Sequence, residues 1–307
     1  MTTGIPCRPQ VPFGSQADIS TTRPESDTMR NVPLIRAKVQ CGDCLKLLPK
    51  VDSRSMPSIL SDPPYPEIDR AYGRLSEAEW MQMMKQVVLE CRRVLTPKGS
   101  AVFVLQPNSR RVGTVRPWLW DFLGWCAREW NIVQDCYWAN PVVPPNVHSQ
   151  RRYGLMRPCL KYLVWLGDPD CYRNQDEVLL PLAESTRTSR RTDCDLQYQP
   201  SGLSMRSGRC LQVARERGGS TPMNLLRIAN SNSRTSAGAL GHGAGTPLAL
   251  ADWWIRYITR PGDTVLDPFA GTASIGVAAV RLGRHYLGFE KMPEYWKKAQ
   301  QRLRDAG

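Results

Sequence analysis

Short apolar runs alternate with amphipathic stretches of helical length over most of this 307-residue chain. From Leu34 onward the apolar runs are bounded by turn residues, a pattern typical of a largely parallel sheet covered by helices. Seven runs predict strands, at Ile35–Gln40, Pro57–Leu60, Ala101–Gln106, Ile132–Asn140, Lys161–Leu166, Thr264–Leu266 and His285–Phe289. The pattern therefore predicts an α/β domain over residues 34–307, built on a seven-stranded, Rossmann-like sheet.

The best-marked helix lies between the second and third predicted strands. Ser76 and Glu79 form a capping-box pattern at its start, and Pro97 to Gly99 predict its end. Trp, Met and Val side chains recur along it with the 3.6-residue period, which indicates a face packed against a sheet rather than a ligand site. Further helices are predicted at Val115–Trp130, Pro247–Tyr257, Ile275–Leu282 and Pro293–Leu303.

The chain is strongly basic, with 41 Lys and Arg against 28 Asp and Glu and a formal net charge of +13. Such an excess favours a polyanionic partner, bound through phosphate contacts and counterion release. Nucleic acid is favoured over a membrane, because no stretch approaches the roughly 18 apolar residues that a membrane span needs. The first residues also lack the apolar core of a signal peptide, and we expect a cytoplasmic protein.

Two segments depart from the alternating pattern. Residues 1–33 are rich in Ser, Thr, Pro and charge, which predicts a flexible tail. Over residues 168–239, arginines stand among Ser, Thr and Gly with few regular apolar positions, so this segment is either an inert insertion or a lobe that reads DNA. Arginine contacts phosphates and pairs with guanine edges, which favours the second interpretation. The candidate DNA-binding residues are Arg157, Arg187, Arg190, Arg191, Arg206 and Arg209.

The ten cysteines do not predict a metal site or a disulfide framework. Only Cys41 and Cys44 form a C-x-x-C pair, without the second pair that a structural zinc site needs. The three histidines, His148, His242 and His285, stand far from one another in the sequence. We therefore expect no metal and interpret the cysteines as reduced, partly buried thiols.

The tetrapeptide Asp62-Pro63-Pro64-Tyr65 follows the second predicted strand. Its residue types suit methyl transfer to an aromatic amine, whose lone pair is delocalised into the ring. The Asp62 carboxylate and the Pro63 carbonyl can accept the amine hydrogens, and consecutive prolines restrict the backbone that positions them. Tyr65 can stack on a base turned out of the duplex. The alternative is an ordinary turn at the end of a strand, which proline pairs often mark.

A second motif begins where the predicted strand at Thr264 runs into Asp267-Pro268-Phe269-Ala270-Gly271 and a helix. A ligand can lie there across the carboxyl ends of the strands, near a helix N-terminus. Asp267 suits a cationic group such as the amino group of S-adenosylmethionine, and Glu290, at the end of the next strand, suits ribose hydroxyls. Neither a G-x-x-x-x-G-K-[ST] loop nor G-x-G-x-x-G is present, which argues against a nucleotide triphosphatase and a nicotinamide enzyme.

Together the two motifs resemble the amino-methylating DNA methyltransferases, which act on N6 of adenine or N4 of cytosine. The order of motifs is that of the permuted bacterial and phage group, and the resemblance runs from about Val39 to Leu303. It implies a circularly permuted methyltransferase fold, S-adenosylmethionine as cofactor and double-stranded DNA as substrate, in a bacterium or a phage-infected host cell. A cognate restriction nuclease and a homodimer are further partners that it suggests.

Individual residues follow from the resemblance as well. Gly42 to Leu48 resembles the family's G-D-C segment, which implies that Asp43 contacts the cofactor's adenine, and His242 to Pro247 resembles the entry to the cofactor site. The implied catalytic residues are Asp62, Pro63, Pro64 and Tyr65. The implied cofactor-binding residues are Asp43, Asp62, His242, Thr246, Pro247, Asp267, Pro268, Phe269, Ala270, Gly271 and Glu290.

Two positions depart from the family pattern, with Thr246 where lysine is usual and Ala273 where a second glycine is usual. Both lie near the expected cofactor and predict altered binding rather than blockage. N6 of adenine is the favoured target, because the similar N4-cytosine enzymes more often carry serine where Asp62 stands. N4 of cytosine, an RNA substrate and a DNA-binding protein without turnover remain as alternatives.

Overall fold

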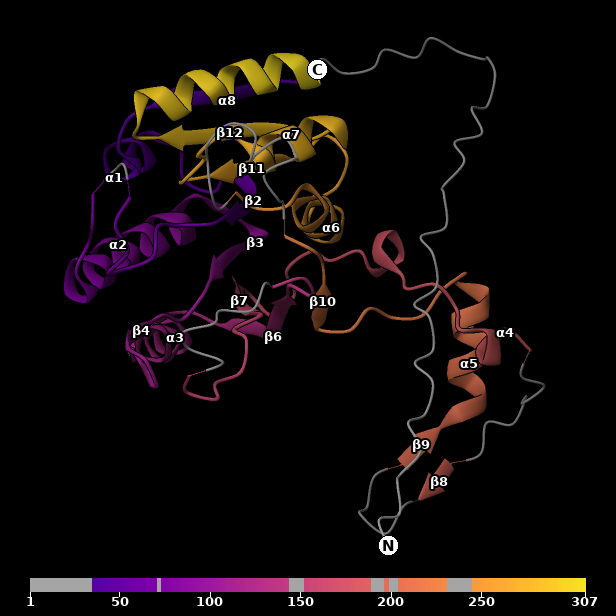
Figure 1. Cartoon of the computed structure of the whole chain (residues 1–307). Coiled ribbons are helices and arrows are strands. Elements are labelled where there is room, and N and C mark those ends of the chain that lie inside the picture. The colour runs from indigo at the N-terminus through magenta and orange to yellow at the C-terminus, as the bar shows by residue number, and fades with distance from the viewer. Residues whose placement is uncertain (1–34, 71–72, 144–151, 189–195, 199–203, 231–244) are drawn as a thin grey trace, which may run out of the picture. The chain divides into compact units, whose positions relative to one another are not determined.

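A computed structural model describes residues 35–70, 73–143, 152–188, 196–198, 204–230 and 245–307 (Figure 1). Its main sheet has the strand order β1-β12-β11-β2-β3-β7-β6-β10. Strand β7 runs antiparallel to both of its neighbours, and all other neighbouring strands are parallel. The strands are β1 (Ala37–Cys41), β2 (Met56–Ser61), β3 (Leu95–Leu105), β6 (Ile132–Ala139), β7 (Leu160–Gly167), β10 (Leu225–Arg227), β11 (Thr264–Asp267) and β12 (His285–Glu290).

The sheet therefore has eight strands where the sequence predicts seven. All seven predicted strands are present, and the additional strand, β10, lies inside residues 168–239 and pairs with β6. It escapes prediction because it has only three residues, of which Leu226 alone is buried. Part of the segment expected to be an insertion thus belongs to the main sheet.

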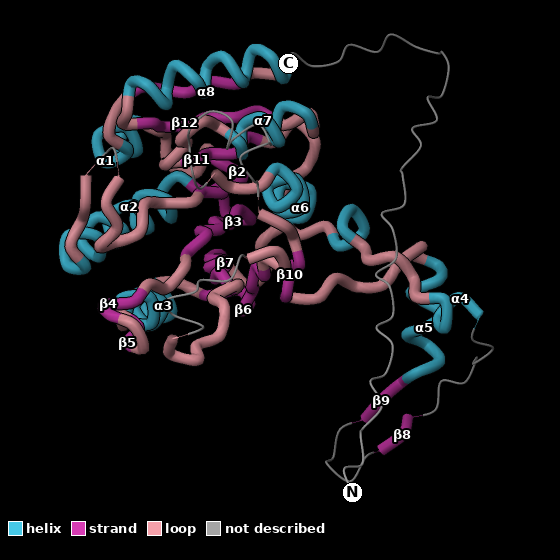
Figure 2. The backbone as a smooth tube through the Cα atoms, viewed as in Figure 1, coloured by secondary structure: helices cyan, strands magenta, loops and turns pink. Residues whose placement is uncertain are grey.

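Helices cover both faces of the sheet (Figure 2). Side chains alternate along β3: Ala101, Phe103 and Leu105 pack into one buried cluster, whereas Val102 and Val104 pack into another. The first cluster includes residues of α1 (Cys44–Leu47), α2 (Glu77–Val94) and α3 (Trp118–Glu129). The second includes residues of α6 (Leu248–Ile258), α7 (Ser274–Arg281) and α8 (Pro293–Ala306). The domain is a three-layer α/β/α structure, as the alternating pattern predicts.

Helix α2 shows how closely local signals specify this layer. The capping box is present, with Glu79 N donating to Ser76 Oγ (3.2 Å) and Ser76 N donating to Glu79 Oε2 (2.8 Å). Trp80 and Met84 are fully buried, which confirms that the apolar stripe packs in the core. The helix ends at Val94, earlier than Pro97, because Leu95 already pairs with Met56 as the first residue of β3.

The structure also describes shorter elements. They are the 3₁₀ helices η1 (Leu48–Lys50) and η3 (Gln175–Val178), the helices α4 (Glu184–Thr188) and α5 (Ser207–Glu216), and the short strands β4 (Ser109–Arg111), β5 (Thr114–Val115), β8 (Leu196–Tyr198) and β9 (Ser204–Arg206). Leu180 and Ser220 exchange backbone hydrogen bonds of 2.8 Å. Arg217 Nε lies 2.7 Å from Asp176 Oδ1. These contacts join the segment after β7 to the end of α5.

Two glycines make room for the ring of Tyr286 between α7 and β12. A Cβ atom added to Gly276 would lie 2.5 Å from Tyr286 Cε1, and one added to Gly288 would lie 2.5 Å from its hydroxyl. Tyr286 is buried and donates a hydrogen bond to Asp267. The close approach of α7 to the sheet therefore depends on the absence of a side chain at both positions.

We predict that Gly276→Ala destabilises the protein by about 1–3 kcal/mol, because the added methyl group overpacks a filled core. Gly124→Ala in α3 is the matched control, since its Cβ would meet only the end of the Arg128 side chain, at 3.4 Å. That change should stabilise by roughly 0.5–1 kcal/mol through helix propensity. Urea denaturation measures both, and equal effects of the two changes would contradict the packing argument.

Candidate active site

A cavity of about 770 Å³ opens at the carboxyl ends of the parallel strands. Asp62 follows β2, Asp267 ends β11, Glu290 ends β12 and Gly42 follows β1, so segments far apart in the sequence meet at one edge. Twelve of the residues predicted from the sequence line it: Asp43, Asp62, Pro63, Pro64, Tyr65, Thr246, Asp267, Pro268, Phe269, Ala270, Gly271 and Glu290. Both motifs therefore face the same space.

Hydrogen bonds hold the Asp62 carboxylate on both of its oxygens. Tyr65 Oη donates to Oδ1 at 2.8 Å, and Thr246 Oγ1 donates to Oδ2 at 3.1 Å. Thr246, one of the two departures from the family pattern, is buried and contacts the Asp-Pro-Pro-Tyr tetrapeptide through this hydrogen bond. The Asp62 carboxylate is therefore held directly after the end of β2, one of the strands that the sequence predicts.

Lys161 is a site residue that sequence reasoning missed. Its Nζ donates to Tyr65 Oη at 3.2 Å and lies 4.7 Å from the centre of the Trp138 ring. Because an ammonium group only donates, the Tyr65 hydroxyl accepts from Lys161 and directs its own proton to Asp62. The available signal was a lysine at the start of an otherwise apolar predicted strand, where a charged side chain needs a partner.

The Asp-Pro-Pro-Tyr backbone is anchored from two neighbouring elements. Trp80 Nε1 of α2 donates to the Pro64 carbonyl at 2.5 Å, and Asn108 Nδ2, beyond β3, donates to the Pro66 carbonyl at 2.6 Å. Both bonds end on carbonyls that follow Pro63 in the chain. The anchoring thus fixes the loop through carbonyls other than the one predicted to accept the amine.

Asp267 is 1% exposed and carries three hydrogen bonds. Ser61 Oγ donates to Oδ1 at 2.5 Å, Tyr286 Oη donates to Oδ2 at 3.1 Å, and the Phe269 amide donates to Oδ1 at 3.2 Å. Burial raises the pKa of this carboxyl to about 7, against the opposing effect of the three hydrogen bonds and with a further rise from the Asp62 charge. A cationic ligand beside it would favour the ionised form.

Glu290 binds the turn of the second motif. Its Oε2 accepts from the Gly271 amide at 2.8 Å, and its Oε1 accepts from the Met292 amide at 2.7 Å. Burial raises the pKa of Glu290, and the backbone hydrogen bonds lower it. Each carboxylate oxygen can accept a second hydrogen bond, so these contacts leave room for ribose hydroxyls.

The turn that leads into α7 contains left-handed backbone. Gly271 has φ of 53° and Ala273 has φ of 56°, a conformation that favours glycine. Arg302 of α8 supports this turn, with Nη1 donating to the Thr272 carbonyl at 2.6 Å and to Ser274 Oγ at 3.1 Å. Ala273 is fully buried and holds this conformation without being glycine, so the second departure from the family pattern carries backbone strain.

Asp43 lies at the rim of the cavity and caps α1. Its Oδ1 accepts from the Leu45 amide at 3.0 Å, and its Oδ2 lies 3.7 Å from Lys291 Nζ. The neighbouring Cys44 is buried, which raises the pKa of its thiol to about 12, whereas Cys41 is exposed. The C-x-x-C pair therefore does not present two available thiols, and the described residues form no cluster of metal ligands.

Several predicted residues lie elsewhere. Pro247 begins α6 without lining the cavity. Arg157 is exposed and donates to the Val143 carbonyl at 3.0 Å, and exposed Arg187 pairs with Glu184 at 3.3 Å. Arg206 and Arg209 belong to β9 and α5, where only the backbone is described, and three predicted residues lie outside the described ranges: Arg190, Arg191 and His242.

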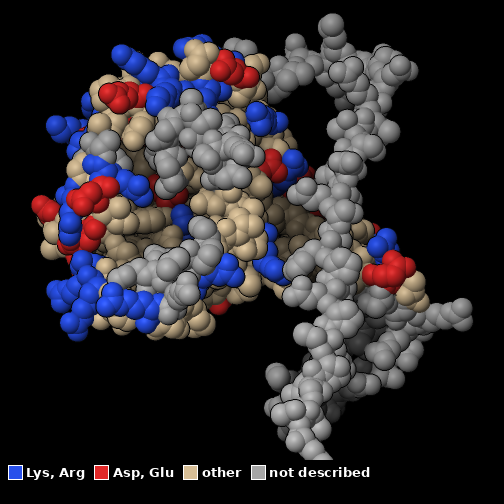
Figure 3. All heavy atoms as spheres, in the orientation of Figure 1, with Lys and Arg blue, Asp and Glu red and all other residues tan. Residues whose placement is uncertain are grey.

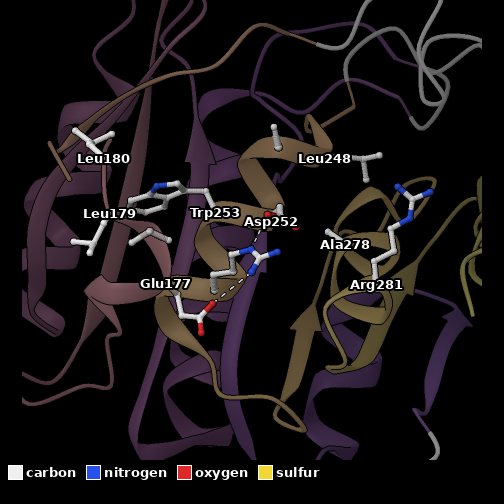
Figure 4. Close-up of a pocket in the computed structure, with 11 residues that line it drawn as sticks. Glu177, Leu179, Leu180, Leu248, Asp252, Trp253, Ala278 and Arg281 are labelled. Carbon is white, nitrogen blue, oxygen red and sulfur yellow. Dashed lines mark hydrogen bonds and ion pairs between the residues drawn. The ribbon is translucent and has the colours of Figure 1, made fainter. Parts of the chain in front are cut away.

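A second cavity, of about 460 Å³, lies between η3, α6 and α7 (Figure 4). Apolar side chains such as Leu179 and Trp253 line it. Arg256 pairs with Asp252 (2.9 Å), one turn earlier in α6, and with Glu177 of η3 (3.4 Å). No residue of either motif lines this cavity, and its two acids are already paired with arginine. The two motifs therefore meet at the larger cavity.

None of the helices in the described ranges is long and apolar enough to span a membrane.

Known proteins are similar to this chain in both sequence and fold. The chain is 26% identical over 273 residues to the type II methyltransferase M.PvuII of Proteus hauseri, covering 83% of this chain and 80% of that protein. It is 27% identical over 271 residues to the DNA adenine methyltransferase YhdJ of Escherichia coli K12, covering 85% and 81%.

Solved structures show the same architecture. The PvuII DNA methyltransferase, described as cytosine-N4-specific, superposes with a TM-score of 0.67 at 22% identity, covering 87% of this chain and 86% of that one. A DNA modification methylase of Thermus thermophilus, complexed with S-adenosyl-L-methionine, gives a TM-score of 0.56 at 22% identity, covering 88% and 95%.

A family model described as DNA methylase, for N6- and N4-methyltransferases, matches residues 57–301, a span that includes the Asp-Pro-Pro-Tyr tetrapeptide, the second motif and the sheet between them. With both motifs lining one cavity in a fold shared with solved methyltransferases, this chain belongs to the N6 and N4 DNA methylase family.

Proposed function

We propose that this protein transfers the methyl group of S-adenosylmethionine to N6 of adenine in double-stranded DNA. The observation that carries the proposal is the position of Asp62, whose carboxylate is held by Tyr65 and Thr246 beside the cavity that Asp267 and Glu290 also line. An acceptor for the amine and a binding site for a cationic cofactor thus share one space of about 770 Å³.

The residues around the cavity fit S-adenosylmethionine, which carries an ammonium and a sulfonium charge and a ribose. The buried Asp267 carboxyl, with its pKa raised to about 7, is stabilised in its ionised form by a neighbouring cation. Glu290 retains acceptor capacity for the ribose, and Asp43 and Lys291 offer an acceptor and a donor at the rim. The bound cofactor would supply an electrophilic methyl group on its sulfonium.

The tetrapeptide prepares the nucleophile in this proposal. A base turned out of the duplex presents its amine to the Asp62 carboxylate and the Pro63 carbonyl, and two accepted hydrogen bonds localise the lone pair on nitrogen. The amine competes with the Tyr65 hydroxyl for Asp62 Oδ1, which frees the Tyr65 ring to stack on the base. As the N–C bond formed, the S–CH3 bond of the cofactor would break and leave a neutral thioether. The nitrogen would lose one proton, for which Asp62 is the acceptor within reach.

N4 of cytosine is the second candidate target. Its support is the fold shared with the PvuII enzyme, whose description is cytosine-N4-specific, whereas YhdJ is described as a DNA adenine methyltransferase. Asp62 favours adenine, since serine is more usual at that position among the similar N4-cytosine enzymes. The chemistry at the two amines is nearly the same, so the mechanism holds for either base.

We predict that Asp62→Asn lowers kcat by at least about 10²-fold, because the neutral amide no longer stabilises the developing positive charge on the amine. The assay digests methylated duplex DNA to nucleosides and identifies the product by mass spectrometry, with N6-methyl-2′-deoxyadenosine expected from the wild type. Calorimetry with S-adenosylmethionine measures cofactor binding by the variant separately, so that a loss of kcat can be told from a loss of the cofactor site. Full activity of Asp62→Ala would exclude this mechanism.

A second prediction concerns pH. Since Asp267 ionises near pH 7 in the free protein, affinity for S-adenosylmethionine should rise with pH up to about 7 and level off above it, by at most about tenfold per pH unit. The folded protein binds this proton more tightly than the unfolded chain does. The free energy of unfolding of the free protein should therefore decrease as the pH rises from about 4 to about 7. Calorimetry across this range tests the first effect, and Asp267→Asn should remove the pH dependence.

We further predict that Lys161→Met lowers kcat by roughly 10- to 100-fold, as expected for the loss of a charged hydrogen bond that directs the Tyr65 hydroxyl. Lys161→Arg retains a donor and should recover much of that loss. Affinity for S-adenosylmethionine should be the same in both variants. A change in cofactor affinity without a change in kcat would contradict the assignment of Lys161 to the base side of the cavity.

A further inference from the structure

A small β-hairpin stands beside the mouth of the larger cavity. Strands β4 and β5 follow β3 at its carboxyl end, the same edge of the sheet at which Asp62 and Asp267 lie. Arg111 pairs with Thr114 across a two-residue turn, in which Gly113 has φ of 78°. The turn conformation favours glycine and gives a short two-stranded ribbon.

Both ends of the hairpin are fixed to the segment that follows the catalytic tetrapeptide. Asn108, just before β4, donates through Nδ2 to the Pro66 carbonyl at 2.6 Å, one residue beyond Tyr65. Arg116, just after β5, donates its amide to the Asn108 carbonyl at 2.9 Å and its guanidinium to Glu77 at 2.5 Å. The hairpin is therefore fixed to the side of the cavity that the Asp-Pro-Pro-Tyr tetrapeptide lines.

The hairpin presents charge and apolar surface to the solvent. Every residue from Ser109 to Val115 is exposed, including Val112 (39%) and Val115 (52%). Among the described residues, no acid pairs with Arg110 or Arg111, and the Arg111 guanidinium contacts only Thr114 Oγ1, at 3.4 Å. Lys and Arg atoms gather on the surface where Figure 1 labels β4 (Figure 3).

We propose that this hairpin contacts the phosphodiester backbone of the DNA substrate beside the flipped base, with Arg110 and Arg111 on the phosphates. The inference rests on the proposed function. A base that reaches Asp62 stays covalently linked to its strand, so its flanking phosphates pass the rim of the cavity, where the hairpin stands. Arginine binds phosphate oxygens bidentately, and the exposed valines suit contact with the sugars.

The alternative is that these arginines are merely solvated surface charge. The two interpretations differ in ionic-strength dependence, because each phosphate contact contributes about 0.9 to the slope of log Kd against log salt concentration. The test variant is Arg110→Ala combined with Arg111→Ala. The matched control combines Arg54→Ala with Arg281→Ala, two exposed arginines at the amino ends of the strands, opposite the cavity.

The experiment measures the Kd of each protein for unmodified duplex DNA by fluorescence anisotropy at several NaCl concentrations. We expect the hairpin variant to bind at least about tenfold more weakly at low salt and to lose about 2 from the slope. The control should retain the wild-type slope, and both should bind S-adenosylmethionine as the wild type does. A wild-type slope in the hairpin variant, or equal losses in hairpin and control variants, would overturn the proposal.

Methylation of the same DNA by the wild type tests the proposed function separately, because the binding measurement needs no turnover. If the wild type forms no methylated base while the hairpin variant loses the salt slope, the proposed reaction fails and the DNA contact stands. If methylation occurs and the slope is unchanged, the DNA contact fails and the reaction stands.

Discussion

A buried hydrogen bond between Ser61 and Asp267 is the interaction on which the site depends. Ser61 Oγ donates to Asp267 Oδ1 at 2.5 Å, and it joins the last residue of β2 to the last residue of β11. The next residues along the chain are Asp62 and Pro268, so one contact sets the separation between the Asp-Pro-Pro-Tyr tetrapeptide and the second motif. The two segments are about two hundred residues apart in the sequence, and only the parallel pairing of β2 with β11 brings them together.

Two residues near this contact are in unfavourable states, a buried carboxyl and a left-handed backbone. Burial of Asp267 disfavours its ionised form, and Ala273 holds a left-handed conformation in the adjoining turn. Arg302 and Glu290 bind this turn from α8 and β12, and Tyr286 donates to Asp267 from the sheet. Residues outside the motifs thus hold a conformation that is unfavourable in isolation, as is common where a site is prepared for a ligand.

Much of this architecture is readable from the sequence, because local signals agree with the final structure. The capping box at Ser76, the apolar stripe of α2 and the period-two runs of the strands each follow from residues near one another in the chain. Strand ends at Asp62, Asp267 and Glu290 predict a shared edge through the geometry of parallel sheets. These rules specify which side chains surround the cavity.

Other features could not be predicted, since they depend on distant contacts. Lys161 gains its place only because β7 lies next to β3, and no local pattern relates it to Tyr65. Strand β10 is too short for a periodic signal, and the bond from Thr246 to Asp62 requires the loop before α6 to reach β2. The sequence shows that Thr246 departs from the family pattern, but it does not show that Thr246 bonds to Asp62.

The strand order has a consequence for how the protein can diversify. The segment after Gly167 leaves the sheet at the end of β7 and returns to it at β10, with β6 lying between these two strands. Within this segment, the bridge between Leu180 and Ser220 brings the outgoing and returning chain together. The residues beyond that bridge can change in length and composition without altering the register of any strand beside the cavity. Such an arrangement permits exchange of this region between homologous genes while the sheet that lines the cavity is inherited intact.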